Sequence, residues 1–281
     1  MNPDTLATNT SPDVVFQSLL GTVNSLAREA GRRIMLIYES DFAVTEKPDQ
    51  SPLTQADLAS HDCLQAGLSA LSPSWPVISE ESADIPFIER STYQTYWLID
   101  PLDGTKEFIK RNGEFTVNVA LIHRHRPVLG VVYAPVLDLC YFAAMGCGAF
   151  RQTGTGVPVP ISVATPALKP PRLVGSRSHG SSSLDAFIEK IGPHEWRAIG
   201  SSLKFCRVAE GSADLYPRFG PTSEWDTAAA QCVVEAAGGA VVDLSGQAIA
   251  YNLKPSILNP SFLVFGDSGF CWPALAAGCC E

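Results

Sequence analysis

The order of hydrophobic patterns along this chain of 281 residues predicts a mixed α and β fold. Stretches with helical periodicity alternate with short apolar runs that read as strands, and several neighbouring runs are separated by turn residues. With 46% hydrophobic residues the chain can bury a substantial core, and its length suits one large domain or two packed halves. A disordered chain is therefore excluded.

Two amphipathic helices and a set of strands are expected in the first half. Ser11-Pro-Asp13 is typical of a helix start, and apolar residues at helical spacing from Val15 to Ile37 predict one long helix. A second helix is expected from Gln55 to Leu71, with Thr54 as its cap. Strands are then predicted near 76–79 and 95–100, as a hairpin at 117–122 and 128–133, and at 140–144.

The stretch Thr153–Pro160 is rich in turn residues and predicts a boundary between halves. We accordingly divide the chain into an extension at 1–13, an α+β half at 14–160 and an α/β half at 161–281. In the second half strand-like and helical stretches alternate, as in an α/β layer. Its strands are expected at 172–174, 196–199, 213–216, 240–242 and 262–265, and its helices near 182–191, 201–210, 227–237 and 271–277.

The stretch Leu98–Thr105 carries the most chemical information. Pro101 is expected to stop the preceding apolar strand, and Gly104 permits a tight turn. Asp100 and Asp103 would then project from this turn, close enough to share a cation. The alternative is that each Asp merely caps a turn, which is common for an Asp before Pro or Gly.

A second acidic pair, Glu80-Glu81, follows the apolar run Pro76–Ser79. Carboxylates brought close together repel one another unless a metal ion neutralises them. Hard oxygen ligands of this kind suit Mg²⁺ or Mn²⁺. The five histidines of the chain form no cluster with ligand spacing, so the sequence favours a site built from oxygen ligands.

These acidic motifs resemble those of the inositol monophosphatase-like family of Mg²⁺-dependent, Li⁺-sensitive phosphatases. The resemblance rests on Glu80-Glu81, Asp100-Pro-Leu-Asp-Gly-Thr105 and Trp225-Asp-Thr-Ala-Ala229, and it runs from about Val14 to about Ala277. Within the family the chain looks most like the bacterial CysQ-type 3′(2′),5′-bisphosphate nucleotidases. That closer likeness depends on Lys106–Phe115, Gly175–His179, Gly200–Phe205 and Leu215–Gly220.

The resemblance implies a layered α-β-α-β-α sandwich and a set of metal ligands. It implies that two or three Mg²⁺, with Mn²⁺ as a substitute, are bound by Glu80, Asp100, the main-chain carbonyl of Leu102, Asp103 and Asp226. Glu81 is expected to support them. Read without the family, Asp226 would be the N-cap of a helix over Thr227–Ala237.

The family also implies how a water molecule is activated and how the substrate is recognised. Asp57, which alone would be a favourable acid in a first helical turn, is expected to orient a metal-bound water together with Thr105. The nucleotide and its non-reacting phosphate would be held by His179, Ser201, Lys204 and Arg218. The reacting end would contact Glu80, Leu102, Asp103, Gly104, Thr105 and Asp226.

The residue types alone do not decide whether the lysines and arginines near these motifs bind substrate. Arg218 offers a fork of donors suited to phosphate, yet Lys204 and Arg218 could each be an ordinary solvated surface charge. Lys106, Lys110 and Arg111 could screen an incoming anion or form an ordinary exposed loop.

The function implied is hydrolysis of 3′-phosphoadenosine 5′-phosphate to AMP and phosphate, in support of sulfate assimilation. An inositol monophosphatase or sugar bisphosphatase would use the same metal centre, and a nucleotide sensor without catalysis is the alternative outside the enzymes. The formal net charge of −9 argues against a nucleic-acid partner.

Cysteine use and hydropathy bear on location. The eight cysteines form no C-x-x-C pair, no export signal is recognisable, and no run approaches the ~20 apolar residues of a membrane span. We expect a cytoplasmic protein, with peripheral inner-membrane association inherited only from the resembling bacterial group. A monomer and a dimer are both left open, and Cys279-Cys280 has no assigned role.

Overall fold

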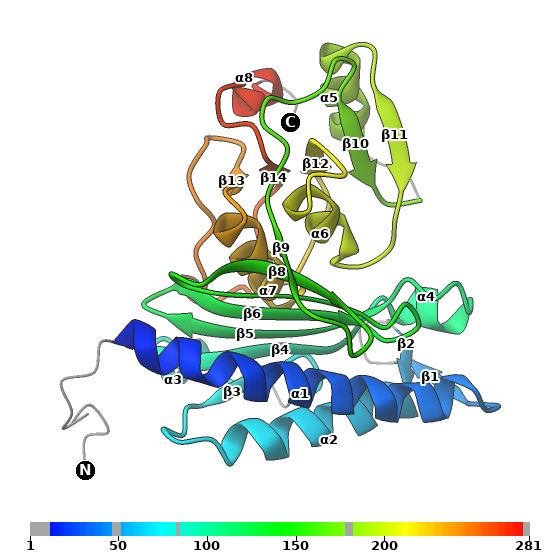
Figure 1. The fold of residues 1–281 in the computed structure, drawn as a ribbon, viewed down its shortest axis with the longest axis vertical. Coiled ribbons are helices and arrows are strands. Elements are labelled where there is room, and N and C mark those ends of the chain that lie inside the picture. Colours follow the sequence, from blue (N-terminus) through cyan, green and yellow to red (C-terminus); the bar gives the residue numbers. More distant parts are fainter. Residues whose placement is uncertain (1–11, 47–51, 83–84, 178–181, 278–281) are drawn as a thin grey trace.

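The structure, a computed structural model, describes residues 12–46, 52–82, 85–177 and 182–277. Its helices and sheets form layers in the order α-β-α-β-α, which confirms the expected sandwich (Figure 1). Figure 1 shows α1 and α2 on one side of a large sheet and α6 and α7 on its other side. A second sheet follows, with α5 and α8 on its outer side.

The first sheet has seven strands in chain order, which makes most of its contacts local in sequence. All neighbouring strands are antiparallel except β3 and β4, which run parallel. The strands are β3 (Val77–Ser79), β4 (Thr95–Asp103), β5 (Thr116–His123), β6 (Arg126–Ala134), β7 (Leu139–Ala144), β8 (Gly148–Thr153) and β9 (Val159–Ile161). The predicted boundary after residue 160 therefore falls inside the last strand of this sheet.

The second sheet has five strands and mixed directions, with β10 parallel to both its neighbours and β14 antiparallel to both of its own. Its order is β11 (Glu195–Ala198), β10 (Arg172–Gly175), β12 (Leu215–Arg218), β14 (Phe262–Phe265) and β13 (Ala240–Asp243). The helices are α1 (Pro12–Tyr38), α2 (Gln55–Ser69), α3 (Phe87–Arg90), α4 (Thr105–Ile109), α5 (Ser182–Ile191), α6 (Leu203–Ala209), α7 (Glu224–Ala236) and α8 (Trp272–Ala276). A short hairpin pairs β1 (Val44–Glu46) with β2 (Pro52–Thr54).

Strands β4 to β7 of the first sheet are buried on both faces, and β4 shows how. Trp97 and Ile99 pack into the cluster under α1 and α2, whereas Tyr96 and Leu98 point into the cluster between the sheets. Successive side chains of a strand point to opposite faces, so a strand covered on both sides reads as one continuous apolar run. That explains why this region looked so uniformly hydrophobic in the sequence.

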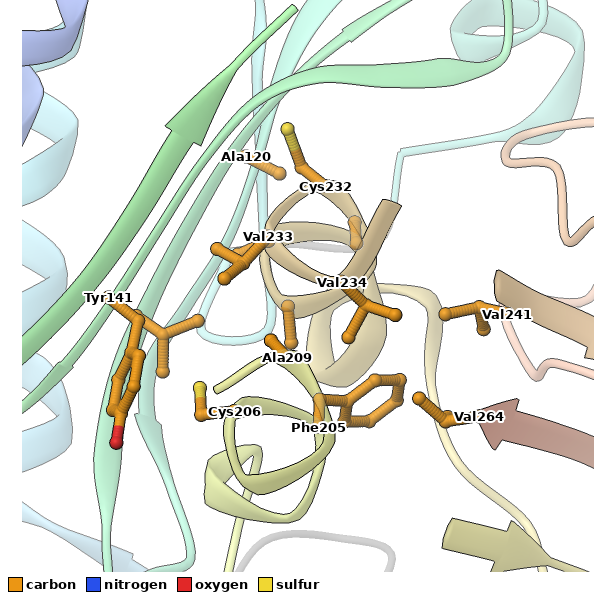
Figure 2. Packing of buried hydrophobic residues seen from close by; sticks show 14 of the residues in the cluster. Ala120, Tyr141, Phe205, Cys206, Ala209, Cys232, Val233, Val234, Val241 and Val264 are labelled. Atoms are coloured by element: carbon orange, nitrogen blue, oxygen red, sulfur yellow. The ribbon is translucent and has the colours of Figure 1, made fainter. Parts of the chain in front are cut away.

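Helix α7 lies unusually close to β6 because the strand offers a glycine there. A Cβ atom on Gly130 would stand 2.2 Å from the carbonyl oxygen of Ala229. Figure 2 shows Cys232, Val233 and Val234 of α7 between the strands of the first sheet and Val241 and Val264 of the second. This close packing fixes the position of α7 relative to the first sheet.

The end of strand β4 differs from the end predicted from the sequence. Pro101 does not stop the strand, which continues to Asp103 with a shift of register between Asp100 and Asp103. A bulge accommodates a proline because the residue that lacks an N–H donor is left out of the pairing. The carbonyl of Pro101 accepts a hydrogen bond from Ser60 Oγ at 2.7 Å.

Other differences concern short or marginal elements. Six short elements were not predicted from the sequence, namely β1, β2, α3, α4, β8 and β9, and β12 begins two residues later than predicted. Residues 12 and 13 belong to α1 rather than to an extension. Among the described residues, no helix is both long and apolar enough to cross a membrane, and the six described cysteines are free thiols.

Candidate active site

Three carboxylates from separate elements converge beside the end of β4. They come from Glu80 after β3, from Asp100 on β4 and from Asp226 in the first turn of α7. One oxygen of each lies within 4.8 Å of the others. Because β3 and β4 run parallel, their carboxyl ends meet at the same edge of the sheet, and the N–H of Glu80 donates to the carbonyl of Ile99 at 3.3 Å.

The pKa values of Asp100 and Asp226 indicate that a cation would stabilise this group of carboxylates. Burial, together with the negative charges of Glu80, Asp103 and Asp226, raises the pKa of Asp100 well above its ordinary value. Burial and the charges of Asp103 and Glu80 raise the pKa of Asp226 to about 8. Burial and the neighbouring negative charges thus disfavour the ionised forms of Asp100 and Asp226. A divalent ion would stabilise these charged forms, and carboxylate oxygens are the hard ligands that Mg²⁺ prefers.

Helix α7 begins earlier than the sequence suggested, and this changes the local role of Asp226. The N-cap is Ser223, and Asp226 is the third helical residue, where it accepts the Ser223 N–H at 2.9 Å. The two residues form a capping box, which fixes the carboxylate at the helix start. Because Oδ2 takes this bond, the other oxygen can face the acidic group.

Asp103 does not belong to the group of three and instead faces the second half of the chain. Its Oδ2 accepts the Ser202 N–H at 2.6 Å and lies 3.4 Å from both Thr116 Oγ1 and Asn118 Nδ2. Burial raises the pKa of Asp103 to about 6, against the opposing effect of Lys204 and these hydrogen bonds.

The polar residues around Asp103 were not predicted from the sequence to be part of the site. Thr116 and Asn118 lie on the otherwise apolar strand β5, and both are buried. Buried polar side chains need partners, and Ser202 Oγ supplies them, at 2.8 Å from Thr116 Oγ1 and from Asn118 Oδ1. The signal was available, because two polar residues interrupt a run that is apolar on both faces.

Asp57 and Thr105, the predicted water-activating pair, are in contact. Thr105 Oγ1 donates to Asp57 Oδ1 at 3.2 Å. The other oxygen of Asp57 accepts both the N–H and the hydroxyl of Thr54, at 2.7 and 2.6 Å, so the predicted cap of α2 also fixes this carboxylate. Gly104, with φ of +95°, provides the left-handed turn that brings Thr105 back beside Leu102.

The Leu102 main chain lies within this arrangement. Its N–H donates to Asp100 Oδ1 at 3.0 Å, and its carbonyl oxygen lies 3.5 Å from Thr105 Oγ1. The backbone turn therefore connects the acidic group to the Asp57–Thr105 pair.

A cavity of about 350 Å³ opens beside these residues. From the first half it is lined by Asp103, Gly104 and Lys106, and Asp226 reaches it from α7. The remaining lining includes Ser176, Arg177, Ser201, Lys204 and Arg218. Acidic and basic side chains thus face the same space, which suits a substrate that carries phosphate next to a bound cation.

The segment Gly200–Ser202 brings the second half against the first. Ser201 has a φ of +46°, which is uncommon for a residue with a side chain. Lys204 Nζ donates to the carbonyl of Ser201 at 2.7 Å and lies 3.4 Å from that of Ile199. Burial lowers the pKa of Lys204 to about 8, although Asp103 opposes that shift.

Arg218 is fixed on β12 by its own neighbours. Its Nε donates to Thr222 Oγ1 at 2.7 Å, and its Nη2 donates to the carbonyl of Pro221 at 2.8 Å. Its Nη1 lies 3.4 Å from Ser176 Oγ. The predicted cation therefore lines the cavity as a held group and not as a mobile surface charge.

The comparison with known proteins decides the family. The sequence model of the inositol monophosphatase family matches residues 16–272. The chain belongs to this family. A relative from Salmonella typhimurium, described as a 3′(2′),5′-bisphosphate nucleotidase CysQ, is 50% identical over 249 residues, covering 88% of this chain and 99% of the relative.

Solved structures of the inositol monophosphatase family support the same assignment. The crystal structure of CysQ from Bacteroides thetaiotaomicron, 41% identical, has a TM-score of 0.80 and covers 90% of this chain and 98% of its own. An inositol monophosphatase from Thermotoga maritima, 23% identical, has a TM-score of 0.77 over 92% of this chain and 96% of its own, which shows the shared fold.

Several predicted residues lie apart from this arrangement. His179 falls outside the described residues, as do Cys279 and Cys280. Glu81 is not one of the three grouped carboxylates, and its predicted supporting role stays a prediction. Arg111 donates to the carbonyls of Tyr38 and Ser40 at the end of α1, the latter at 2.7 Å, so it anchors that helix end.

Proposed function

We propose that this member of the inositol monophosphatase family hydrolyses 3′-phosphoadenosine 5′-phosphate to AMP and phosphate. The observation that carries the proposal is the 50% identity to a 3′(2′),5′-bisphosphate nucleotidase along 99% of that protein. The cavity is lined by Asp103 and Asp226 together with held cations from the second half, which is consistent with a substrate that has two phosphates.

The oxygen ligands fit Mg²⁺, on which the family generally depends. Glu80, Asp100 and Asp226, which the fold brings together, would hold it, and Asp103 and the carbonyl of Leu102 stay predicted ligands. Two or three ions, with Mn²⁺ as a substitute, also stay predictions. Bound Mg²⁺ would supply positive charge that lowers the pKa of a coordinated water and offsets the charge of the phosphate.

The protein groups themselves position a water molecule and its proton. Because Thr105 donates its hydroxyl hydrogen to Asp57, its oxygen can accept a hydrogen bond from an attacking water. Asp57, held on its other oxygen by Thr54, keeps that hydroxyl in one orientation and can receive the proton through it. No covalent nucleophile is required.

Recognition of the second phosphate would distinguish the nucleotide from an inositol phosphate. Lys204 and Arg218 present charge to the cavity, and both are oriented by main-chain carbonyls. His179 is proposed from the family resemblance alone. The cytoplasmic location and the link to sulfate assimilation stay predictions, and a monomer and a dimer both stay open.

The decisive experiment compares phosphate release from 3′-phosphoadenosine 5′-phosphate and from inositol 1-phosphate, each with Mg²⁺ and with EDTA. We expect strong preference for the nucleotide and loss of release with EDTA. Preference for inositol 1-phosphate would retain the metal site but reject the proposed substrate. Absence of metal-dependent release from both would reject the proposed enzyme activity.

A further inference from the structure

An ion pair that was not predicted from the sequence reaches the substrate cavity through its arginine. Arg177 follows β10 and belongs to the cavity lining. Its Nη2 lies 2.6 Å from Oε1 of Glu114, which precedes β5 in the first half. The side chains of Arg177 and Glu114 are 45% and 25% exposed respectively, so Arg177 lies at the cavity surface and Glu114 is partly buried beside it.

Glu114 is held by a second contact, which makes it a rigid partner. Its Oε2 accepts the N–H of Gly200 at 2.6 Å. A Cβ on Gly200 would stand 2.6 Å from the Glu114 carbonyl oxygen, so only glycine permits this approach. Burial favours the neutral acid, but the bonds from Arg177 and Gly200 outweigh it and lower the pKa of Glu114 below its ordinary value.

The neighbouring cations of the second half, which also line the cavity, donate part of their hydrogen bonds to the protein itself. Lys204 donates to the carbonyl of Ser201, and Arg218 donates to Thr222 and Pro221. A guanidinium has five N–H donors, so the ion pair with Glu114 does not exhaust Arg177. Its planar fork matches the oxygens of a phosphate, and a side chain already fixed in place loses little entropy when a ligand binds.

We propose that Arg177 binds the non-reacting phosphate of the bisphosphate nucleotide and that Glu114 is its positioning residue. The inference rests on the proposed function and adds a specificity-determining pair to it. Glu114 contacts Arg177 with one oxygen and the Gly200 segment with the other. Glu114 therefore fixes the position of the Arg177 guanidinium relative to Ser201 and Lys204.

The test compares 3′-phosphoadenosine 5′-phosphate with adenosine 3′-monophosphate, which lacks the second phosphate. Arg177→Gln should lower kcat/KM for the bisphosphate by about 10- to 100-fold, the range for losing a charge-assisted hydrogen bond, and leave the monophosphate unchanged. It should raise the inhibition constant of adenosine 5′-monophosphate by a similar factor. Glu114→Gln should show a smaller, equally selective loss.

The double variant tests whether Glu114 acts through Arg177. If it does, Arg177→Gln combined with Glu114→Gln behaves like Arg177→Gln alone, because the second change removes nothing further. Additive losses would reject the positioning role. Arg197→Gln, an exposed arginine of β11 outside the cavity lining, is the matched control and should resemble the wild type on both substrates.

The remaining outcomes separate this inference from the proposed function. If the wild type hydrolyses the bisphosphate but Arg177→Gln affects both substrates equally, or neither, the inference is wrong and the proposed function stands. If the wild type does not hydrolyse the bisphosphate at all, both are wrong. Should Arg177→Gln fail to fold by circular dichroism, Arg177→Lys keeps the charge without the fork and must show the same selective loss.

Discussion

Replacing Asp226 by Asn should stabilise the metal-free protein at neutral pH while it abolishes hydrolysis. Burial and the charges of Asp103 and Glu80 raise the pKa of Asp226 from 3.8 to about 8. Between these values the folded state holds a proton that the unfolded state has released. The stability of the wild type therefore falls as the pH rises through this window, whereas Asn carries no charge and escapes the loss.

The magnitude follows from the size of the shift. At pH 7, roughly three units above the unfolded pKa, the penalty on the wild type is about 4 kcal/mol. Weakening the hydrogen bond from the Ser223 N–H, which is 2.9 Å long, would cost about 1 kcal/mol of helix capping. The net gain of ~3 kcal/mol corresponds to an increase in Tm of roughly 6–12 °C for a chain of this size.

Thermal unfolding in EDTA at pH 5, 7 and 8, followed by circular dichroism, measures the effect. The gain should nearly vanish at pH 5, only about one unit above the unfolded pKa, because the lost cap then offsets it. Asp243→Asn, at the end of β13 and outside the group of three carboxylates, serves as the control. Added Mg²⁺ should raise the Tm of the wild type far more than that of the variant.

Two results would refute this reasoning. A variant less stable than the wild type at pH 8 in EDTA would show that burial and the neighbouring charges do not destabilise the ionised Asp226 in the fold. A gain of the same size at pH 5 and pH 8 would show that the stabilisation has another origin than the removal of charge.

Further predictions concern packing, recognition and water activation. Gly130→Ala should lower the free energy of unfolding by about 1–3 kcal/mol, as measured in urea, because the new Cβ would lie 2.2 Å from the Ala229 carbonyl oxygen. Unchanged stability would mean that α7 can move away freely. Lys204→Met should raise the KM for 3′-phosphoadenosine 5′-phosphate by about tenfold or more, with a smaller effect on kcat, because a charged donor is lost. An unaltered KM would show that Lys204 does not bind the substrate. Thr105→Val should lower kcat by about 100-fold with little change in KM, since the hydrogen bond to Asp57 at 3.2 Å is lost. A change in KM alone, measured by steady-state kinetics, would argue against a role of Thr105 in activating the water.

Helices with clear local signals could be predicted from the sequence, and weak edge strands could not. Thr54 caps α2 as expected, because its own side chain and that of Asp57 satisfy the helix start. Strand β8 was missed because its exposed positions alternate with few buried ones, and Pro160 obscured β9. The start of α7 was misplaced, although Ser223 and Asp226 have the spacing of a capping box.

The sequence by itself determined the family, the chemistry and the carboxylates offered to a metal ion, because these depend on residue types at fixed spacing in short motifs. Only the tertiary structure decided which of them meet. Glu80, Asp100 and Asp226 come within 4.8 Å of one another, whereas Asp103 turns to the N–H of Ser202 and Arg177 meets Glu114. Hydrophobic periodicity specifies the face of each element, but the distance between side chains far apart in sequence depends on how the layers pack. A close approach such as that of α7 to Gly130 sets those distances.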